Sequence, residues 1–276
     1  MTTPFWTLYF TVLSFVGGLC IGSFLNVCIY RIPLGLSIVR PRSYCPSCQK
    51  PIAAFDNIPV LSYLLLRGRC RACRAPISLR YPLVELLTGV LFLAIWNHYG
   101  ATPLTPVYML VTFGLILGSF VDIDHMILPD RVTLGGILLG LILSPLLPAL
   151  HGKSTPLDGL LASALGVLAG AGSLYLVGVI GKAALKRDAM GLGDVKLLGA
   201  IGAFFGWQAV LFTIIISSVI GSVGGLLLIA FGGLELRGRM PFGPYLALAA
   251  VIWMLGGDVL WDWYISFITA RPTPHS

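Results

Sequence analysis

Charged side chains are scarce in this chain of 276 residues. Asp, Glu, Lys and Arg together make up 11% of the sequence, whereas 57% of the residues are hydrophobic. A soluble globular domain carries about 25% charged residues, so this sequence has too few to cover a water-facing surface of its size. The shortage excludes an ordinary soluble protein and predicts a chain that lies largely within a lipid bilayer.

Several segments have no Asp, Glu, Lys or Arg over lengths that exceed one bilayer crossing, which takes about 20 apolar residues in a helix. These segments are residues 5–30, 86–121, 132–152, 159–181 and 197–234. The two longest must each contain a turn, and turn-forming residues occur at 97–103 and at 206–208. With the last apolar segment, 241–260, the sequence predicts an all-α polytopic membrane protein with about eight transmembrane helices.

Positive charge is missing from the beginning of the chain. No Lys or Arg precedes Arg31, so we expect the first apolar segment to remain as a span and not to be a cleavable signal peptide. Cytoplasmic loops carry an excess of Lys and Arg. If the segment from Arg31 to Arg80 is cytoplasmic, sixteen of the eighteen cations lie inside, and only Lys153 and Arg271 lie outside. The pattern therefore predicts an N-terminus outside.

The net charge of +7 needs no nucleic-acid partner. A basic cytoplasmic face against the anionic headgroups of a lipid bilayer accounts for it. No nucleic-acid-binding motif accompanies the charge, so the sequence predicts no nucleic acid among the partners.

Four of the six cysteines form two Cys-x-x-Cys motifs in the polar segment, separated by 21 residues. Cys45 and Cys48 make the first motif, and Cys70 and Cys73 make the second. Two such turns complete a tetrahedral thiolate cage for zinc. Reducing conditions in the cytoplasm disfavour structural disulfides, and redox-active dithiols remain the alternative. Four thiolates leave no open position on zinc, so we predict a structural ion that staples a short segment.

Acidic residues inside or beside a predicted span are informative, because charge is costly there and suggests function. Asp122 directly continues an apolar run, and Asp194 opens a later span behind Gly191 and Gly193. Asp124 lies roughly on the opposite helix face from Asp122 and nearer water. The two glycines lack side chains, and we expect them to let another backbone approach closely.

Two other acids have simpler interpretations. Asp130 follows Pro129 and is expected to be the N-terminal cap of a span. Glu85 lies about one turn inside the second span, close enough to the interface for its side chain to extend to water.

Two carboxylates that converge in a poorly hydrated site can share one proton, because both cannot easily ionise together. The ionised carboxylate then accepts a proton from a bound water, and the protonated one donates a hydrogen bond to the scissile carbonyl. This is aspartyl-protease chemistry, and it requires no metal. Asp122 and Asp194 could instead relay protons in a transporter, and a zinc-bearing assembly factor without catalysis is a third interpretation.

Ordered motifs across nearly the whole chain resemble those of type IV prepilin peptidases, the GxGD-type membrane aspartyl proteases. The motifs are GSFLNV at 22–27, YRIP at 30–33, both cysteine motifs, NIPVLSY at 57–63, RYPLVEL at 80–86, the segment around Asp122, GLGDVK at 191–196 and PFGPY at 241–245. A lone Gly-x-Gly-Asp would be weak, whereas the set in this order is highly specific.

The resemblance implies an enzyme of the bacterial inner membrane. Its activity would be cleavage of the short basic leader from type IV prepilins or type II secretion pseudopilins at the cytoplasmic face. The implied catalytic residues are Asp122 and Asp194. The motif residues around them are expected to have supporting roles: Asp124, Gly191, Gly193 and Lys196.

The resemblance also implies a second activity, N-methylation of the new N-terminal residue with S-adenosylmethionine as cofactor. Family members associate this activity with the cysteine-bearing cytoplasmic region, which this chain retains. The expected organisation is a first transmembrane helix at 1–31, a cytoplasmic zinc-binding subdomain at 32–80 that is the candidate methyltransferase part, and a transmembrane aspartyl peptidase domain at 81–276.

Two prolines should interrupt regular helix at the start of the last span. Irregular backbone at that depth is tolerated where it lies within protein or faces a cavity. We expect Pro241, Phe242, Gly243 and Pro244 to hold the substrate in an extended form near the carboxylates. A plain turn leading into the helix is the alternative.

Overall fold

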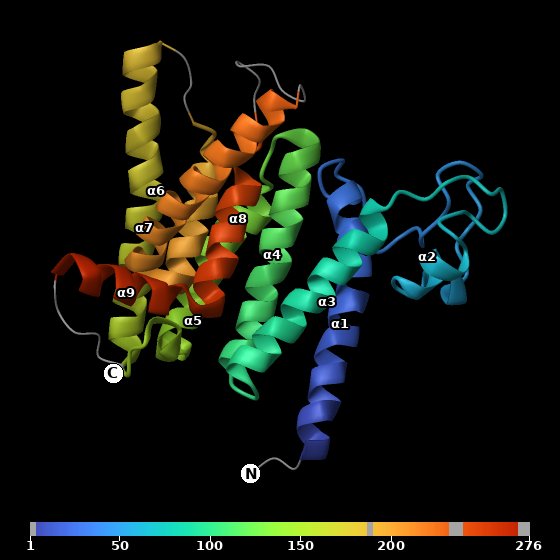
Figure 1. Cartoon of the computed structure of the whole chain (residues 1–276), viewed down its shortest axis with the longest axis horizontal. Coiled ribbons are helices and arrows are strands. Elements are labelled where there is room, and N and C mark those ends of the chain that lie inside the picture. Colours follow the sequence, from blue (N-terminus) through green and yellow to red (C-terminus); the bar gives the residue numbers. More distant parts are fainter. Residues whose placement is uncertain (1–3, 187–189, 232–239, 270–276) are drawn as a thin grey trace. The chain divides into compact units, whose positions relative to one another are not determined.

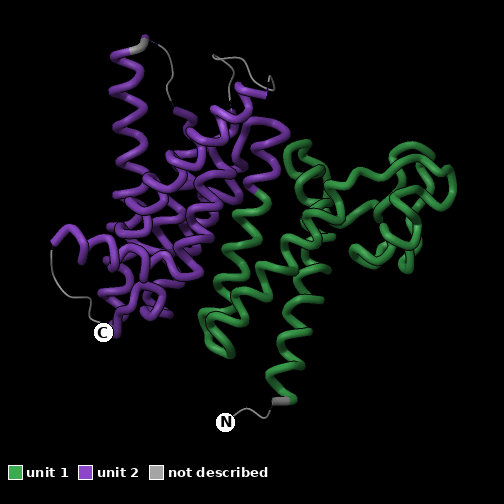
Figure 2. The backbone as a smooth tube through the Cα atoms, in the orientation of Figure 1, with its two compact units in different colours: residues 1–117 green, residues 118–276 purple. Residues whose placement is uncertain are grey.

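The computed structural model describes residues 4–186, 190–231 and 240–269. Within these ranges the chain is helical and contains no strand beyond isolated β-bridges. It divides into two compact units, residues 1–117 and 118–276 (Figure 2). The predicted all-α fold is confirmed. Four cations used in the predicted orientation, Arg187, Arg237, Arg239 and Arg271, lie outside the described residues.

The first unit is built on a helix pair joined by the cysteine-bearing segment (Figure 1). The pair consists of α1 (Pro4–Arg31) and α3 (Arg80–Tyr99). The connecting segment contains a 3₁₀ turn, η1 (Ala54–Asn57), and the short helix α2 (Leu61–Leu65). The backbones of α1 and α3 approach each other closely at a glycine. A Cβ added to Gly22 on α1 would lie 2.6 Å from the Cα of Glu85 on α3.

The helix α4 (Leu104–His125) begins in the first unit and ends in the second. The helices that follow it are α5 (Asp130–Leu146), η2 (Pro148–His151), α6 (Pro156–Leu185), α7 (Leu192–Ala230), α8 (Gly243–Ile252), the π-helical η3 (Trp253–Gly257) and α9 (Asp258–Thr269). Small side chains again mark the contacts, and the Ser163 hydroxyl on α6 donates a 2.7 Å hydrogen bond to the Ala203 carbonyl on α7.

Both predicted turns are present. The first lies between the end of α3 at Tyr99 and the start of α4 at Leu104. The second is a kink inside α7 at Gly206, whose φ of 80° and ψ of 179° break the helix. Glycine tolerates this conformation because it has no Cβ.

Five helical segments among the described residues are long and apolar enough to cross a bilayer. They are Phe5–Arg31, Leu104–His125, Pro156–Ala184, Leu192–Ala230 and Gly243–Thr269. The predicted multi-pass membrane protein is therefore confirmed. The helix α5, with 17 residues, is shorter than these spans, and the total of about eight spans stays a prediction.

Candidate active site and metal centre

Asp122 lies in the last turns of α4, next to the fully buried Val121, and is itself 6% exposed. Its carboxylate accepts a 3.0 Å hydrogen bond from the backbone N–H of Gly243. Gly243 is the first residue of α8, where N–H groups have no acceptor within the helix. The carboxylate satisfies this donor and also complements the positive end of the helix dipole. The first residue of α8 is thus joined directly to Asp122.

Asp194 is in the first turn of α7 and is half-buried. Its carboxylate turns back toward the residue before the helix, since a Cβ added to Gly191 would lie 3.0 Å from Asp194 Oδ2. Asp194 is close enough to Asp122 for the two carboxylates to repel each other electrostatically. The structure therefore brings the two predicted acids into one region.

Leu128, in the loop between α4 and α5, fills the space where three helices of the second unit meet. Added Cβ atoms would lie 3.3 Å from its side chain at Gly118 on α4, 3.0 Å at Gly193 on α7 and 3.3 Å at Gly243 on α8. The bare glycines let this one leucine contact all three helices. Sequence reasoning missed Leu128, because nothing in the sequence distinguishes it from other apolar loop residues.

The expected role of the two glycines before Asp194 needs a correction. We predicted that they admit a neighbouring backbone. Gly193 instead faces the Leu128 side chain, and Gly191 faces the carboxylate of Asp194. The physical reason is that the α4–α5 loop sends a side chain, and no main chain, into this space.

Three other charged residues were singled out in the sequence: Lys196, Asp130 and Asp124. Lys196 donates a 2.6 Å hydrogen bond from Nζ to the Asp130 carboxylate, which joins the second turn of α7 to the first turn of α5. Asp130 is the first residue of α5 and Pro129 is at the cap position, so the predicted capping role of Asp130 was wrong by one residue. An acid in the first turn still complements the helix dipole. Asp124 is exposed, in contrast to Asp122.

Gly243→Ala tests the packing around Asp122. The added Cβ would lie 2.8 Å from Asp122 Oδ2, so the carboxylate or the start of α8 must move. We expect the peptide cleavage that the resemblance implies to fall by about tenfold or more, since overpacking costs about 1–3 kcal/mol. Gly135→Ala is the matched control, because nothing lies within 4 Å of its added Cβ. Equal cleavage rates for the two variants, measured with purified protein in detergent, would contradict this packing.

Glu85 lies on α3 in the first unit. We expected its side chain to extend to water, but it turns inward. It is 8% exposed, and its carboxylate accepts a 2.7 Å hydrogen bond from the backbone N–H of Val60 and bonds with Ser23. Val60 has a φ of 60°, a left-handed conformation that β-branched residues rarely adopt. The carboxylate turns inward because this constrained loop offers it a donor. The expectation from sequence was wrong.

Glu85→Ala should destabilise the loop that precedes α2. Loss of the acceptor leaves the Val60 N–H without a partner, which costs about 1–3 kcal/mol. Glu85→Gln retains an acceptor oxygen and should cost less. Thermal unfolding combined with limited proteolysis around residues 54–66 measures both effects. Identical unfolding temperatures and cleavage patterns for wild type and Glu85→Ala would rule out this role.

The four predicted metal ligands come together in the cysteine-bearing segment. Their sulfurs all lie within 4.8 Å of one another, and the Sγ atoms of Cys45 and Cys73 are 3.8 Å apart. Each motif forms the same kind of turn. The N–H of Cys45 donates to the Lys50 carbonyl at 3.0 Å, and the N–H of Cys70 donates to the Ala75 carbonyl at 2.9 Å.

The thiols favour a divalent cation at their centre. Backbone N–H groups of Cys48 and Ser47 lower the pKa of the Cys45 thiol to about 6. The Ala75 N–H lowers the pKa of Cys73, but burial and the three neighbouring sulfurs raise it, to about 11. Cys45 therefore ionises easily, whereas Cys73 resists ionisation because its thiolate would lie among three other sulfurs. A divalent cation at the centre would offset the repulsion between the thiolates. The residues fit the predicted four-thiolate zinc site.

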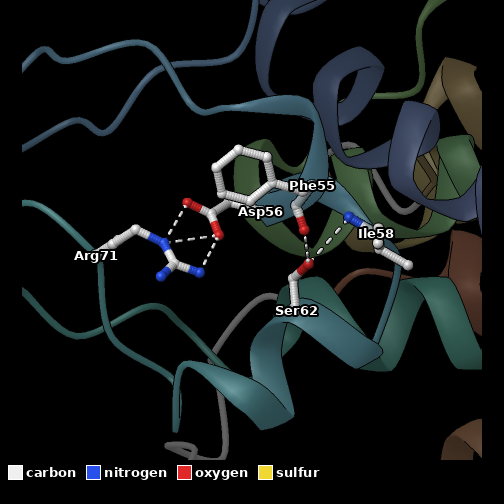
Figure 3. Close-up of polar contacts among 5 residues, drawn as sticks. All are labelled: Phe55, Asp56, Ile58, Ser62 and Arg71. Atoms are coloured by element: carbon white, nitrogen blue, oxygen red, sulfur yellow. Dashed lines mark hydrogen bonds and ion pairs between the residues drawn. The ribbon is translucent and has the colours of Figure 1, made fainter.

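Arg71, inside the second cysteine motif, ties the cluster to the segment before α2 (Figure 3). Its guanidinium makes a bidentate ion pair with Asp56, with an N–O distance of 2.7 Å at its shortest, and lies 5.5 Å from the centre of the Phe55 ring. Hydrogen bonding to Arg71 lowers the pKa of Asp56. Ser62 continues the network, accepting from the Ile58 N–H and donating to the Phe55 carbonyl, both at 3.0 Å.

Fold and site together define a polytopic membrane protein with a convergent pair of carboxylates and a separate four-cysteine cluster. Two family models match the chain: the bacterial peptidase A24 N-terminal domain over residues 16–99, and the type IV leader peptidase family over residues 109–226. The first range contains all four clustered cysteines, and the second contains both Asp122 and Asp194.

Similar proteins cover most of this chain. It is 39% identical to a protein of Aeromonas salmonicida over 95% of both chains, and 37% identical to one of Pseudomonas aeruginosa over 94% of this chain and 95% of that one. It is 46% identical to a protein of Myxococcus xanthus over 81% of this chain, and the match spans 64% of that relative. Each is named prepilin leader peptidase/N-methyltransferase.

No solved structure gave a significant match to this chain. The chain belongs to the type IV leader peptidase family, as the extent and identity of these matches show. The predicted family is confirmed, and with it the predicted class of enzyme.

Proposed function

We propose that this chain cleaves the leader peptide from type IV prepilins or type II secretion pseudopilins at the cytoplasmic face of the inner membrane, and N-methylates the new N-terminal residue. The observation that carries the proposal is the meeting of α4, α7 and α8 around Leu128, which brings buried Asp122 and half-buried Asp194 near enough to repel each other. The names of the relatives support both activities.

Cleavage would use Asp122 and Asp194 as one acid–base pair. The ionised carboxylate accepts a proton from a water whose oxygen attacks the scissile carbonyl carbon. The protonated carboxylate donates a hydrogen bond to the carbonyl oxygen, where negative charge develops. The C–N bond then breaks, and the leaving amine takes up the proton. Because the two groups are coupled, they titrate as a pair.

The surrounding residues would position this pair. The Gly243 N–H fixes one oxygen of Asp122. The Lys196–Asp130 ion pair fixes the start of α7, which carries Asp194. Pro241 and Phe242 lead into α8, which begins at Gly243 and Pro244, and the Gly243 hydrogen bond holds this segment beside Asp122. This position supports contact with the substrate near the scissile bond.

The domain boundaries are proposed as 1–31, 32–80 and 81–276, with the zinc-binding subdomain as the methyltransferase part. Cys45, Cys48, Cys70 and Cys73 would hold zinc, which when bound provides folding energy and no open coordination position. S-adenosylmethionine, when bound, would supply the methyl group for the free N-terminal amine of the cleaved pilin.

The test uses purified full-length protein in detergent with a prepilin, followed by mass analysis of the product. The proposal expects loss of the leader and, with S-adenosylmethionine present, a further gain of one CH₂ mass on the mature pilin. A proton-coupled transporter would leave the prepilin intact yet move protons in liposomes. An assembly factor would do neither, and an intact prepilin would overturn the proposed cleavage.

A further inference from the structure

The cysteine-bearing segment has a large excess of positive charge that has no role in the proposed reactions. Between residues 32 and 79 the chain has seven cations, and Asp56 is the only acid. Four arginines lie close together in space. With Leu65 and Leu66 they line one open pocket, with a volume of about 640 Å³, at the end of α2. These arginines are Arg67, Arg69, Arg71 and Arg74.

The helix beside these arginines presents apolar side chains to the outside. Leu61, Leu64 and Leu65 are all exposed, with exposed fractions of 65% for Leu64 and 72% for Leu65. Their spacing of three and four residues puts them on one face of α2. Ser62, by contrast, is buried in the network with Phe55 and Ile58. An apolar face bordered by arginines is the pattern of elements that lie in a membrane interface.

We propose that this surface docks on the anionic headgroups of the bilayer, with the α2 leucines inserted among the lipids and the arginines on lipid phosphates. We name it the α2–arginine surface and define it as Leu61, Leu64, Leu65, Arg67, Arg69 and Arg74. Arg71 is left out of the definition because Asp56 already pairs with it.

Two arguments favour a lipid occupant over a protein one. The segment directly follows α1, whose residues Phe5–Arg31 are long and apolar enough to cross a bilayer, so the bilayer surface is within its reach. The second argument rests on the proposed function: the leader of the proposed substrate is basic, and the same arginines would repel it. Anionic lipid headgroups attract each juxtamembrane cation, and an exposed leucine face gains from leaving water.

An ion pair and two hydrogen bonds hold the arginines and the α2 leucines in one arrangement. The Arg71–Asp56 pair joins the second cysteine motif to η1, and the Ser62 hydrogen bonds join η1 to α2. The arginines after α2 are therefore held beside its leucines and do not form a loose charged tail. The charge and the apolar face of this surface do not depend on catalysis, so lipid docking can fail while the proposed function stands, and the reverse.

Hydrogen exchange of residues 61–74 in nanodiscs tests the inference with the full-length, zinc-loaded protein. Nanodiscs of phosphatidylcholine alone are compared with nanodiscs that contain about 30% phosphatidylglycerol. We expect exchange to be about tenfold slower on the anionic surface and the difference to shrink at high salt. Equal exchange in both lipids would overturn the proposal.

Variants locate the effect on the surface. The triple change Arg67→Gln, Arg69→Gln and Arg74→Gln should remove the lipid dependence. The matched triple Arg40→Gln, Arg42→Gln and Lys50→Gln, which removes the same charge at the first cysteine motif, should keep most of it. Equal losses in the two triples would show an effect of net charge and refute a local surface. Zinc content identifies any variant that fails to fold.

A second pair of changes keeps every charge. Leu64→Ser with Leu65→Ser should speed exchange in anionic nanodiscs, because the apolar face no longer inserts. Unchanged exchange in this variant would refute insertion. Protection that follows addition of a prepilin, and is independent of lipid charge, would identify a protein as the occupant and overturn the proposal.

Discussion

Asp122→Asn and Asp194→Asn should each reduce leader cleavage by about 10³-fold or more. Asparagine keeps the size of the side chain and one acceptor oxygen, but it can neither take a proton from water nor hold one for the scissile carbonyl. The loss should appear in the rate of the chemical step measured under single-turnover conditions, with mass analysis of the cleaved pilin.

The matched control for this prediction is Asp124→Asn, two positions after Asp122. Asp124 is exposed, whereas Asp122 is buried against Val121 and bound to Gly243. We therefore expect Asp124→Asn to keep cleavage within about tenfold of wild type, as suits a supporting residue, since the polar contacts of an exposed carboxylate contribute only about 0–1 kcal/mol. A larger loss in Asp124→Asn than in Asp122→Asn would contradict the assignment.

Removal of the predicted zinc should unfold the cysteine-bearing segment and stop methyl transfer. Cys45→Ser removes one of four converging sulfurs, and the binding of structural zinc provides about 10–16 kcal/mol in small zinc domains. We expect the variant to contain no stoichiometric zinc, to become sensitive to protease between residues 43 and 76, and to yield cleaved but unmethylated pilin.

Cys20→Ser is the control for the cysteine change. Cys20 lies on α1, is exposed and takes no part in the four-sulfur cluster. Its replacement should preserve zinc content, protease resistance and methylation. Elemental analysis that finds no zinc in freshly prepared, reduced wild-type protein would refute the metal site. Loss of cleavage together with methylation in Cys45→Ser would show that the two activities are not separable.

The parts of this structure that follow from local sequence could be predicted. Segments without charge became helices, because a bilayer accepts only apolar spans whose backbone groups bond internally. The kink at Gly206 was indicated by the turn residues that begin there. The cysteine cluster was predicted because each motif forms its turn over four residues, and only the joining of the two turns required long-range contact.

The contacts that depend on long-range packing could not be predicted in the same way. Asp122 and Gly243 are 121 residues apart, and only the fold shows that the start of α8 meets the end of α4. Glu85 and Val60 are 25 residues apart. The Glu85 carboxylate turns inward because Val60 has a positive φ, and the sequence does not indicate this conformation. Leu128 has no chemical signature, because its role comes from glycines on three other segments.

The most direct test of the account compares Asp122→Asn, Asp194→Asn and the double variant in one cleavage assay. Two groups that act as a single catalytic unit give losses that do not add, because removal of either one already abolishes the reaction. The account predicts that the double variant cleaves no more slowly than the slower single variant. Losses that multiply in the double variant, or a single variant with wild-type cleavage, would contradict a shared site for Asp122 and Asp194.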